Sequence, residues 1–174
     1  MGRWTRKELE DQAHVYRLTA RKSATTGDWS HWANLFTEDA TYVEHHFGRF
    51  CGRDAIYRWI SAITKPYPMN HMIYFPWTWH VIDEERGWVI CELMNRMKDP
   101  GDGSLHEEPN ITILHYAGDG LWSYEEDAYD WQNMARMIAG WQAVKERCEK
   151  LASQGRDPRD ERHIAAIEGV EVKR

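Results

Sequence analysis

The chain has 174 residues, of which 42% are hydrophobic and 29% charged. This composition excludes a disordered or collagen-like protein and fits one globular domain. The formal net charge of −6 argues against a nucleic-acid-binding surface, which depends on clustered Lys and Arg. The sequence lacks a run of about 20 apolar residues, so we expect no membrane span and no membrane partner. The three cysteines include no Cys-x-x-Cys pair, which fits a reducing cytoplasm and predicts a cytoplasmic location.

The first part of the chain is predominantly helical in pattern. A capping box begins at Thr5 and apolar residues then recur at helical intervals, which predicts a helix over residues 5–25. Asp28 can cap a second short helix that ends at Asp39, and residues 40–46 then read as extended. Residues 48–52 are predicted to be a turn, and residues 53–64 return to helical spacing before Pro66.

From residue 70 onward the pattern indicates strands. Four are expected, over residues 71–82, 88–98, 105–116 and 121–129, and Pro76 suggests a bulge or an edge position in the first of them. A last helix is expected over residues 130–151. The domain is therefore predicted to span residues 1–151, followed by a polar tail over residues 152–174.

This order of elements predicts an α+β fold. Successive strands joined by short turns favour a curved antiparallel sheet, and the helices are expected to pack on its concave face. A bent sheet covered by helices leaves a cavity between the two layers, which is a common place for a ligand pocket.

Several segments resemble the SnoaL-like branch of the nuclear transport factor 2-like superfamily, a likeness that covers roughly residues 9–129. The segments are Gly27-Asp28-Trp29, Leu35-Phe36-Thr37-Glu38-Asp39-Ala40-Thr41, Gly48, Gly52-Arg53-Asp54-Ala55-Ile56 and Gly118-Asp119-Gly120-Leu121-Trp122. The resemblance implies a cone-shaped α+β barrel of the cystatin-like type. Relatives include ketosteroid isomerases, scytalone and bile-acid dehydratases, polyketide cyclases, epoxide hydrolases and non-catalytic modules, so the fold does not settle the function.

The resemblance also implies site residues. The isomerases' aspartate base corresponds to Glu44, and the dehydratases' strand histidine corresponds to His71. The position of the isomerases' oxyanion-binding carboxylic acid falls within residues 108–110, where Glu108 and Asn110 share a strand face and Pro109 occupies the nearest position. Two positions depart from the pattern. The position of the isomerases' first-helix tyrosine falls near Ala20, a full helical turn from Tyr16. The position of the dehydratases' aspartate falls at Thr25, whose hydroxyl group cannot take the role of a carboxylate.

Strand alternation places Glu44 on one face with Tyr42 and His46. If that face points into the cavity, a carboxylate, a phenol and an imidazole meet there, and Glu44 is the expected catalytic base with His71 as acid–base partner. If the other face points inward, His45 lines the cavity instead. The expected substrate-binding residues are Tyr16, Trp32, Tyr42, His46, Trp59, Glu108, Asn110 and Asp127.

No metal site is expected, because adjacent histidines on a strand point to opposite faces and no His-x-His or His-Glu-x-x-His spacing occurs. No cofactor is expected either. The sequence thus predicts a dehydratase, isomerase or cyclase that uses general acid–base chemistry on an apolar substrate of the polycyclic, steroid or polyketide kind. The alternative is a non-catalytic module of the same fold that binds a small ligand or dimerises.

A homodimer is also expected. Three of the predicted strands, over residues 71–82, 88–98 and 105–116, carry large apolar residues on both faces. One concave core would use fewer of them, so the convex face of the sheet is the expected interface.

Overall fold

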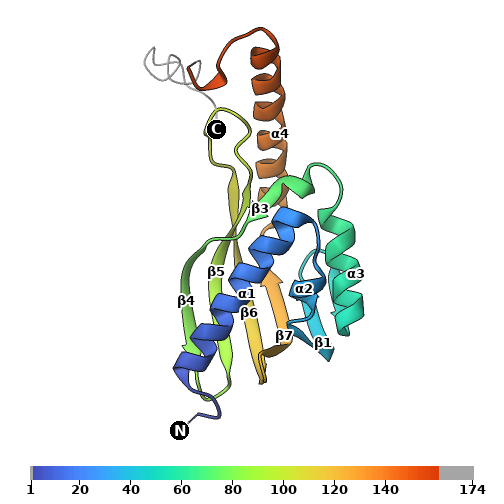
Figure 1. The fold of residues 1–174 in the computed structure, drawn as a ribbon, viewed down its shortest axis with the longest axis vertical. Coiled ribbons are helices and arrows are strands. Elements are labelled where there is room, and N and C mark those ends of the chain that lie inside the picture. The colour runs from blue at the N-terminus through green and yellow to red at the C-terminus, as the bar shows by residue number, and fades with distance from the viewer. Residues whose placement is uncertain (1, 161–174) are drawn as a thin grey trace.

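The computed structural model describes residues 2–160 and shows one curved sheet with helices on its concave side (Figure 1). The helices are α1 (Arg6–Thr26), α2 (Ser30–Ala33), α3 (Arg53–Thr64), the 3-10 helix η1 (Met69–His71) and α4 (Trp131–Ser153). The strands are β1 (Phe36–Glu44), β2 (Gly48–Cys51), β3 (Met72–Tyr74), β4 (Trp77–Asp83), β5 (Trp88–Met97), β6 (Glu107–Gly118) and β7 (Leu121–Ala128). The predicted α+β class is confirmed.

The seven strands form one mixed sheet in the order β2-β1-β7-β6-β5-β3. Strand β4 also pairs with β5, on the same edge as β3 but along a different part of β5. Strands β1 and β7 run parallel, whereas the other pairs are antiparallel. The sheet is curved but does not close into a barrel. The expectation of a wholly antiparallel sheet therefore needs one correction, because the chain returns to β1 only after the β5–β6–β7 meander and meets it in the same direction.

Local sequence signals set the ends of the long helices. The Thr5 side chain accepts a hydrogen bond of 3.2 Å from the Glu8 amide at the start of α1. Gly27 ends that helix in a left-handed conformation with φ of 76°, and its amide donates to the Ser23 carbonyl. Asp130 caps α4 by accepting from two backbone amides. These boundaries lie close to the predicted ones because capping chemistry is local.

The elements around residues 35–52 differ from the prediction. Strand β1 begins at Phe36 and not at residue 40, because the Leu35 carbonyl accepts a hydrogen bond of 2.8 Å from the Trp122 amide and draws this segment into the sheet. Residues 48–51, predicted as part of a turn, form β2 against β1. The first long predicted strand is divided into η1, β3 and β4, with the break at Phe75 and Pro76. In each case pairing with another strand decides the local conformation, with β7 for the start of β1, with β1 for residues 48–51, and with β5 for β3 and β4.

Two apolar clusters hold the layers together. The larger joins α1, α2 and α3 to the sheet, with Leu9, Phe36, Ile56, Leu114 and Trp122 fully buried at its centre. The second gathers Met72, Met97, Met134 and Trp141 beneath α4. Helix α4 extends beyond the helical layer alongside β5 and β6 (Figure 1), and the indole of Trp141 donates a hydrogen bond of 2.6 Å to the Lys98 carbonyl.

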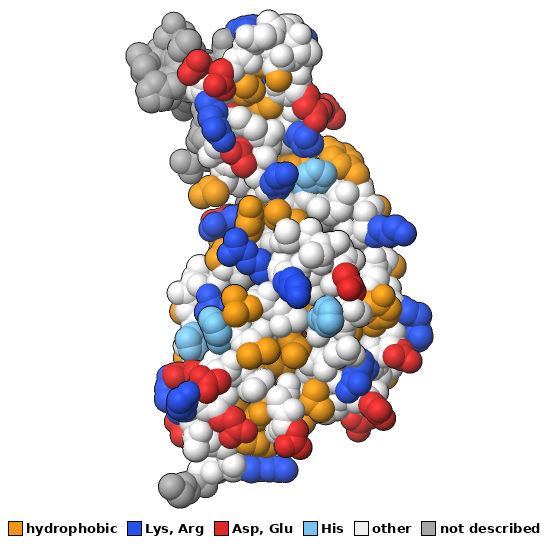
Figure 2. Space-filling model, viewed as in Figure 1, with side chains coloured by type: hydrophobic (Ala, Val, Ile, Leu, Met, Phe, Trp, Pro, Cys, Tyr) orange, Lys and Arg blue, Asp and Glu red, His pale blue; other side chains and the backbone are white. Residues whose placement is uncertain are grey.

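The surface carries both signs of charge. On the side of α1, Lys and Arg side chains are interspersed with Asp and Glu (Figure 2). Within residues 2–160, no helix has the length and apolarity needed to cross a membrane. Helix α4 ends two residues beyond the predicted domain boundary, and Arg159 forms an ion pair of 3.0 Å with Asp99. The predicted tail otherwise extends over residues 161–174, which lie outside the described residues.

Candidate active site

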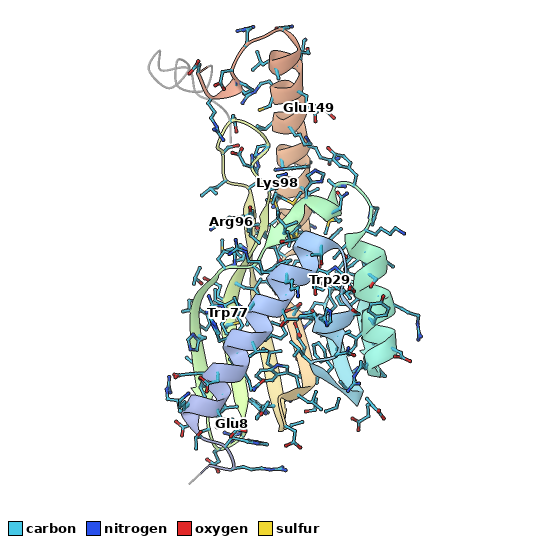
Figure 3. The ribbon with its side chains drawn as sticks, viewed as in Figure 1. Glu8, Trp29, Trp77, Arg96, Lys98 and Glu149 are labelled. Carbon is cyan, nitrogen blue, oxygen red and sulfur yellow. The ribbon has the colours of Figure 1, made fainter. Side chains whose placement is uncertain are left out.

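A cavity of about 120 Å³ lies between the helices and the concave face of the sheet. Its wall is mostly aromatic and apolar, with four tryptophans, Trp29, Trp32, Trp59 and Trp77, joined by a fifth, Trp131 of α4. Trp29, next to α2, and Trp77, on β4, are labelled in Figure 3. Polar side chains interrupt this wall, and its three carboxyl groups come from β1 and β7. An apolar cavity with few polar groups is the usual form of a small-molecule site.

The parallel pairing of β1 and β7 brings four polar residues together on the concave face. Tyr42 is opposite Glu125 in the strand register, and Glu44 is opposite Asp127. The next strand adds Thr112, which pairs with Asp127. All five side chains are on one face of the sheet, so the carboxyl group of Glu44 joins those of Glu125 and Asp127, about 80 residues later in the chain, in one patch of the cavity floor.

A bulge in β7 turns the two carboxyl groups of that strand inward. His115 pairs with Tyr124, but the next residue, Tyr116, pairs with Trp122, so Ser123 is the extra residue. Without the bulge, strict alternation from the buried Trp122 would place Glu125 on the outer face. With it, Trp122 is 0% exposed and Glu125 is 1% exposed on the same side.

Asp127 is held by three hydrogen-bond donors. Its Oδ2 accepts from the Tyr42 hydroxyl, and its Oδ1 accepts from the Asn110 amide at 2.7 Å and from the Thr112 hydroxyl. Burial raises the pKa of Asp127, and these three hydrogen bonds oppose that rise because they favour the charged form. Asp127 is therefore the carboxyl group of the patch whose ionised form is favoured by the most hydrogen-bond donors.

Glu125 is held more weakly. Its Oε1 accepts one hydrogen bond of 2.6 Å from the Tyr16 hydroxyl, while its buried Oε2 has no hydrogen-bond partner among the described residues. Burial, and then the negative charge of Asp127, raise the pKa of Glu125 well above its ordinary value. Tyr42 is also close to Glu125, but its single proton is donated to Asp127. Its surroundings therefore favour the protonated form of Glu125 more than that of Asp127.

Glu44 has a second task besides facing the cavity. Its Oε2 accepts hydrogen bonds from the backbone amides of His46, at 2.8 Å, and Phe47. These bonds hold the turn between β1 and β2, and Phe47 in that turn lines the cavity. The pKa of Tyr129 is raised by burial and by a hydrogen bond with Glu44, so a phenol also adjoins this carboxylate. Oε1 of Glu44 takes part in neither of the two amide hydrogen bonds.

The structure brings most of the predicted site residues to the cavity. Those that line it are Tyr16, Trp32, Tyr42, Glu44, Trp59, Asn110 and Asp127. The inward face of β1 is therefore the one that carries Tyr42 and Glu44, while His45 is outside and contacts Glu126 at 2.8 Å.

Three predicted residues do not line the cavity. His71 ends η1 and its ring packs against Trp141 of α4, with ring centroids 5.0 Å apart. Burial lowers its pKa. His46 lies in the turn after β1, where alternation no longer applies, and stacks on Trp131 at 3.9 Å. Glu108 is on β6 two residues before Asn110, but only Asn110 reaches the wall of the cavity.

The sequence analysis named Asp127 and did not include Glu125 among the candidate site residues. A signal was present, because alternation from Asp127 places Glu125 on the same face. The bulge at Ser123 then determines which face that is, and nothing in the local sequence announces it. Within residues 2–160, no cluster of three or more His, Cys, Asp and Glu side chains could hold a metal ion.

Comparison with known proteins now places the chain in a family. Residues 7–116 match the SnoaL-like domain, and the protein belongs to that family, as the sequence resemblance indicated. The matched range ends before β7, so the Glu125–Asp127 pair rests on the geometry and not on the family match. None of the curated proteins matches the sequence.

Solved structures share the fold at low identity. A protein of ketosteroid isomerase-like fold from Catenulispora acidiphila, in complex with trimethylamine, is 22% identical with a TM-score of 0.54, over 70% of this chain and 91% of that one. A protein assigned as an isomerase from Bacillus subtilis is 17% identical with a TM-score of 0.57, over 76% and 96%. A protein assigned as a polyketide cyclase from Xanthomonas campestris pv. campestris is 17% identical with a TM-score of 0.57, over 76% and 98%.

Proposed function

We propose that this protein is an enzyme that moves a proton on a small, largely apolar substrate, in a reaction of the isomerase, cyclase or dehydratase type. The observation that carries the proposal is Glu125, a carboxyl group with a buried, unpartnered oxygen and a raised pKa, beside the triply hydrogen-bonded Asp127 in the wall of an apolar cavity. Carboxyl groups whose surroundings separate their protonation states are the usual pattern of acid–base sites.

In this proposal Glu125 is the acid and Glu44 is the base. Oε1 of Glu44 removes a proton from a carbon next to a substrate carbonyl, and the electron pair moves onto the carbonyl oxygen. The Glu125 hydroxyl donates a hydrogen bond to that oxygen as its negative charge develops. In an isomerisation, Glu44 then returns the proton to another carbon of the conjugated enolate. In a cyclisation, the enolate carbon attacks a second carbonyl carbon of the substrate, the π bond of that carbonyl breaks, and its oxygen takes the proton back from Glu44, which closes the ring.

Asp127 acts on these groups as a neighbour. Its charge keeps Glu125 protonated, and its hydrogen bond with Tyr42 fixes that phenol at the cavity floor. Glu125 thus takes the part of acid–base partner that the sequence resemblance implied for His71. The similarity to proteins assigned as an isomerase and a polyketide cyclase supports the reaction class, and the trimethylamine complex supports a small ligand in this fold.

Hydrogen–deuterium exchange of a small ketone tests the proposal. Cyclohexanone is of the size of the cavity, and its α-protons exchange in D₂O when a base removes them while an acid holds the oxygen. We expect the wild type to accelerate this exchange, followed by proton NMR, and Glu44→Gln and Glu125→Gln each to lower the acceleration by about 100-fold. Glu108→Gln is the matched control, since that carboxylate does not line the cavity.

Two results would contradict the proposal. Exchange that is equally fast with wild type and Glu44→Gln would show that Glu44 is not the base. Cyclohexanone that binds without faster exchange would indicate the alternative from the sequence, a module that binds a ligand and performs no reaction.

A further inference from the structure

The cavity is small for the substrates that its fold suggests. Its volume is about 120 Å³, whereas a buried apolar cavity of about 150 Å³ is filled by a single benzene ring. The cavity therefore accommodates one ring or a branched chain of similar size. Any larger substrate has to extend beyond it, and the structure shows where.

A second hollow adjoins the first. It is a groove of about 660 Å³ lined by residues of α3, of η1 and of the C-terminal end of α1. These three elements are neighbours in Figure 1. Four residues, Trp29, Thr64, Met69 and Met72, line both the groove and the cavity. One layer of side chains thus separates the two spaces, and two of these side chains are methionines, which change conformation at low cost.

The groove differs from the cavity in chemistry. Its wall is rich in polar side chains, among them Thr25, Asp28, Ser61 and Lys65. Asp28 already accepts a hydrogen bond of 2.9 Å from the Ser30 amide, and its charge and that of Lys65 offset each other. The groove therefore suits an uncharged polar group better than an apolar one.

Two hydrogen-bonding groups in its wall have no partner among the described residues. Trp29 is 4% exposed and its Nε1–H is buried without an acceptor, and the Ser61 hydroxyl is buried likewise. Buried polar groups are rarely left unpaired in folded proteins, because each one costs desolvation energy. Both groups can donate, so an oxygen acceptor is what they lack.

We propose that the cavity and the groove form one site for an amphipathic substrate. An apolar, ring-sized head occupies the cavity, and an uncharged tail with carbonyl or hydroxyl oxygens lies in the groove and accepts from Trp29 and Ser61. The head's position beside Glu44 and Glu125 rests on the proposed function, whereas the tail's position rests on the groove. The tail crosses the wall where Met69 and Met72 lie.

Calorimetry with two probes tests this proposal. Phenol represents the head alone, and 5-phenylpentanamide carries the same ring with a tail that ends in an uncharged carbonyl. We expect the wild type to bind 5-phenylpentanamide at least about tenfold more tightly than phenol. Ser61→Ala should lower the affinity for 5-phenylpentanamide by about three- to tenfold, which is the usual effect of one hydrogen bond. The affinity for phenol should stay unchanged. Trp29→Phe should lower the affinity for 5-phenylpentanamide by a larger factor than the affinity for phenol.

A steric variant gives an independent measurement. Thr25→Trp adds bulk to the groove from an exposed position, and His14→Trp adds the same bulk to an exposed position of α1 that lines neither space. Thr25→Trp should abolish the advantage of the longer probe, and His14→Trp should retain it.

The possible failures are distinguishable. If both probes bind equally, or Ser61→Ala and Thr25→Trp weaken both equally, the groove is not part of the site and the proposed function stands. If phenol does not bind at all, the cavity is not a ring-binding site and both proposals fail. If Glu44→Gln abolishes ketone exchange and the two probes bind equally, only the proposal that the groove is part of the site is contradicted.

Discussion

Tyr16 and Glu125, which are 109 positions apart in the sequence, are joined by a buried hydrogen bond of 2.6 Å from the tyrosine hydroxyl to Oε1 of the carboxyl group. The bond links α1 to β7 across the cavity. Burial and the neighbouring carboxyl groups raise the pKa of Tyr16 well above its ordinary value, so the phenol remains a donor. The position of the first helix and the protonation of the cavity floor are thereby coupled.

The first prediction concerns Glu125→Gln and the pH dependence of stability. The pKa of Glu125 in the folded protein is raised above its ordinary value of 4.5. Below that value both the folded and the unfolded chains hold the proton. As pH rises, the unfolded chain loses its proton while the folded chain keeps it, so the wild type loses stability, by about 1.4 kcal/mol for each unit of pKa difference. Glutamine imitates the protonated acid, so Glu125→Gln should melt several degrees higher than wild type near neutral pH and equally near pH 4.5.

Glu126→Gln is the control for that measurement. Glu126 is adjacent on β7, but hydrogen bonds from Tyr124 and His45 lower its pKa. A group with a lowered pKa stabilises the folded protein at pH values above its ordinary pKa, and this stabilisation is lost as pH falls. The pH dependence that Glu126 contributes is therefore opposite to that of Glu125. Melting curves for both variants, recorded by circular dichroism across this range, check the prediction. A Glu125→Gln protein that is less stable than wild type at neutral pH would show that Glu125 is ionised in the fold.

The second prediction is that Asp127→Asn lowers the pKa of Glu125. The substitution removes the negative charge that helps keep Glu125 protonated. It also leaves one acceptor oxygen for three donors, which should lower the free energy of unfolding by about 2–4 kcal/mol. The carbon-13 resonance of the Glu125 carboxyl group, followed in a pH titration, measures the shift. Asp11→Asn, on the exposed face of α1, should leave that titration unchanged. An unchanged titration in Asp127→Asn would show that the charge of Asp127 does not influence the pKa of Glu125.

The part of the site on strand β1 could be predicted from the sequence, whereas the part on strand β7 could not. Strand β1 alternates without interruption, so Tyr42 and Glu44 could be placed on one face from spacing alone, and the structure buries both. Strand β7 contains the bulge at Ser123, which arises from pairing with β6 and β1. That pairing joins residues more than 70 positions apart in the case of β1, and a local pattern contains no information about it.

His71 illustrates the second limit. The sequence placed it correctly at the entrance to a strand, but the direction of its ring depends on α4, which packs over that end of the sheet. The His71 carbonyl accepts a hydrogen bond of 2.7 Å from the Lys98 amide, and its ring lies against Trp141. A helix that begins sixty residues later in the chain, at Trp131, therefore decides that this histidine is turned away from the cavity.

The third prediction concerns the tail beyond Leu151. Among the described residues, the tail contacts the body through the exposed ion pair between Arg159 and Asp99. Exposed pairs of this kind stabilise a fold by about 0–1 kcal/mol. Truncation after Leu151 removes the last two residues of α4 and should lower the melting temperature by no more than a few degrees. A loss of ten degrees or more would show that the tail is part of the domain.

The convex face of the sheet carries a ladder of stacked rings. Trp88 on β5 stacks on His115 of β6, with ring centroids 4.2 Å apart, and His115 stacks on Tyr124 of β7 at 4.4 Å. Val81 of β4 is opposite Ile90 of β5 in the register, and these residues continue the face toward the sheet edge. Val81 is 53% exposed. A sheet face of this composition is suited to contact with a second protein surface.

The last prediction is that this convex face joins two copies of the chain, as the apolar content of both strand faces led us to expect. Val81→Lys places a charge in the proposed interface and should convert a dimer to a monomer at micromolar concentration, as measured by sedimentation velocity, because burying an unpaired charge is costly. Leu18→Lys is the matched control: Leu18 is 55% exposed but lies on α1, on the helical side of the sheet. The control should remain dimeric. A wild type that sediments as a monomer would contradict the prediction, and dissociation by Leu18→Lys but not by Val81→Lys would move the interface to the helices.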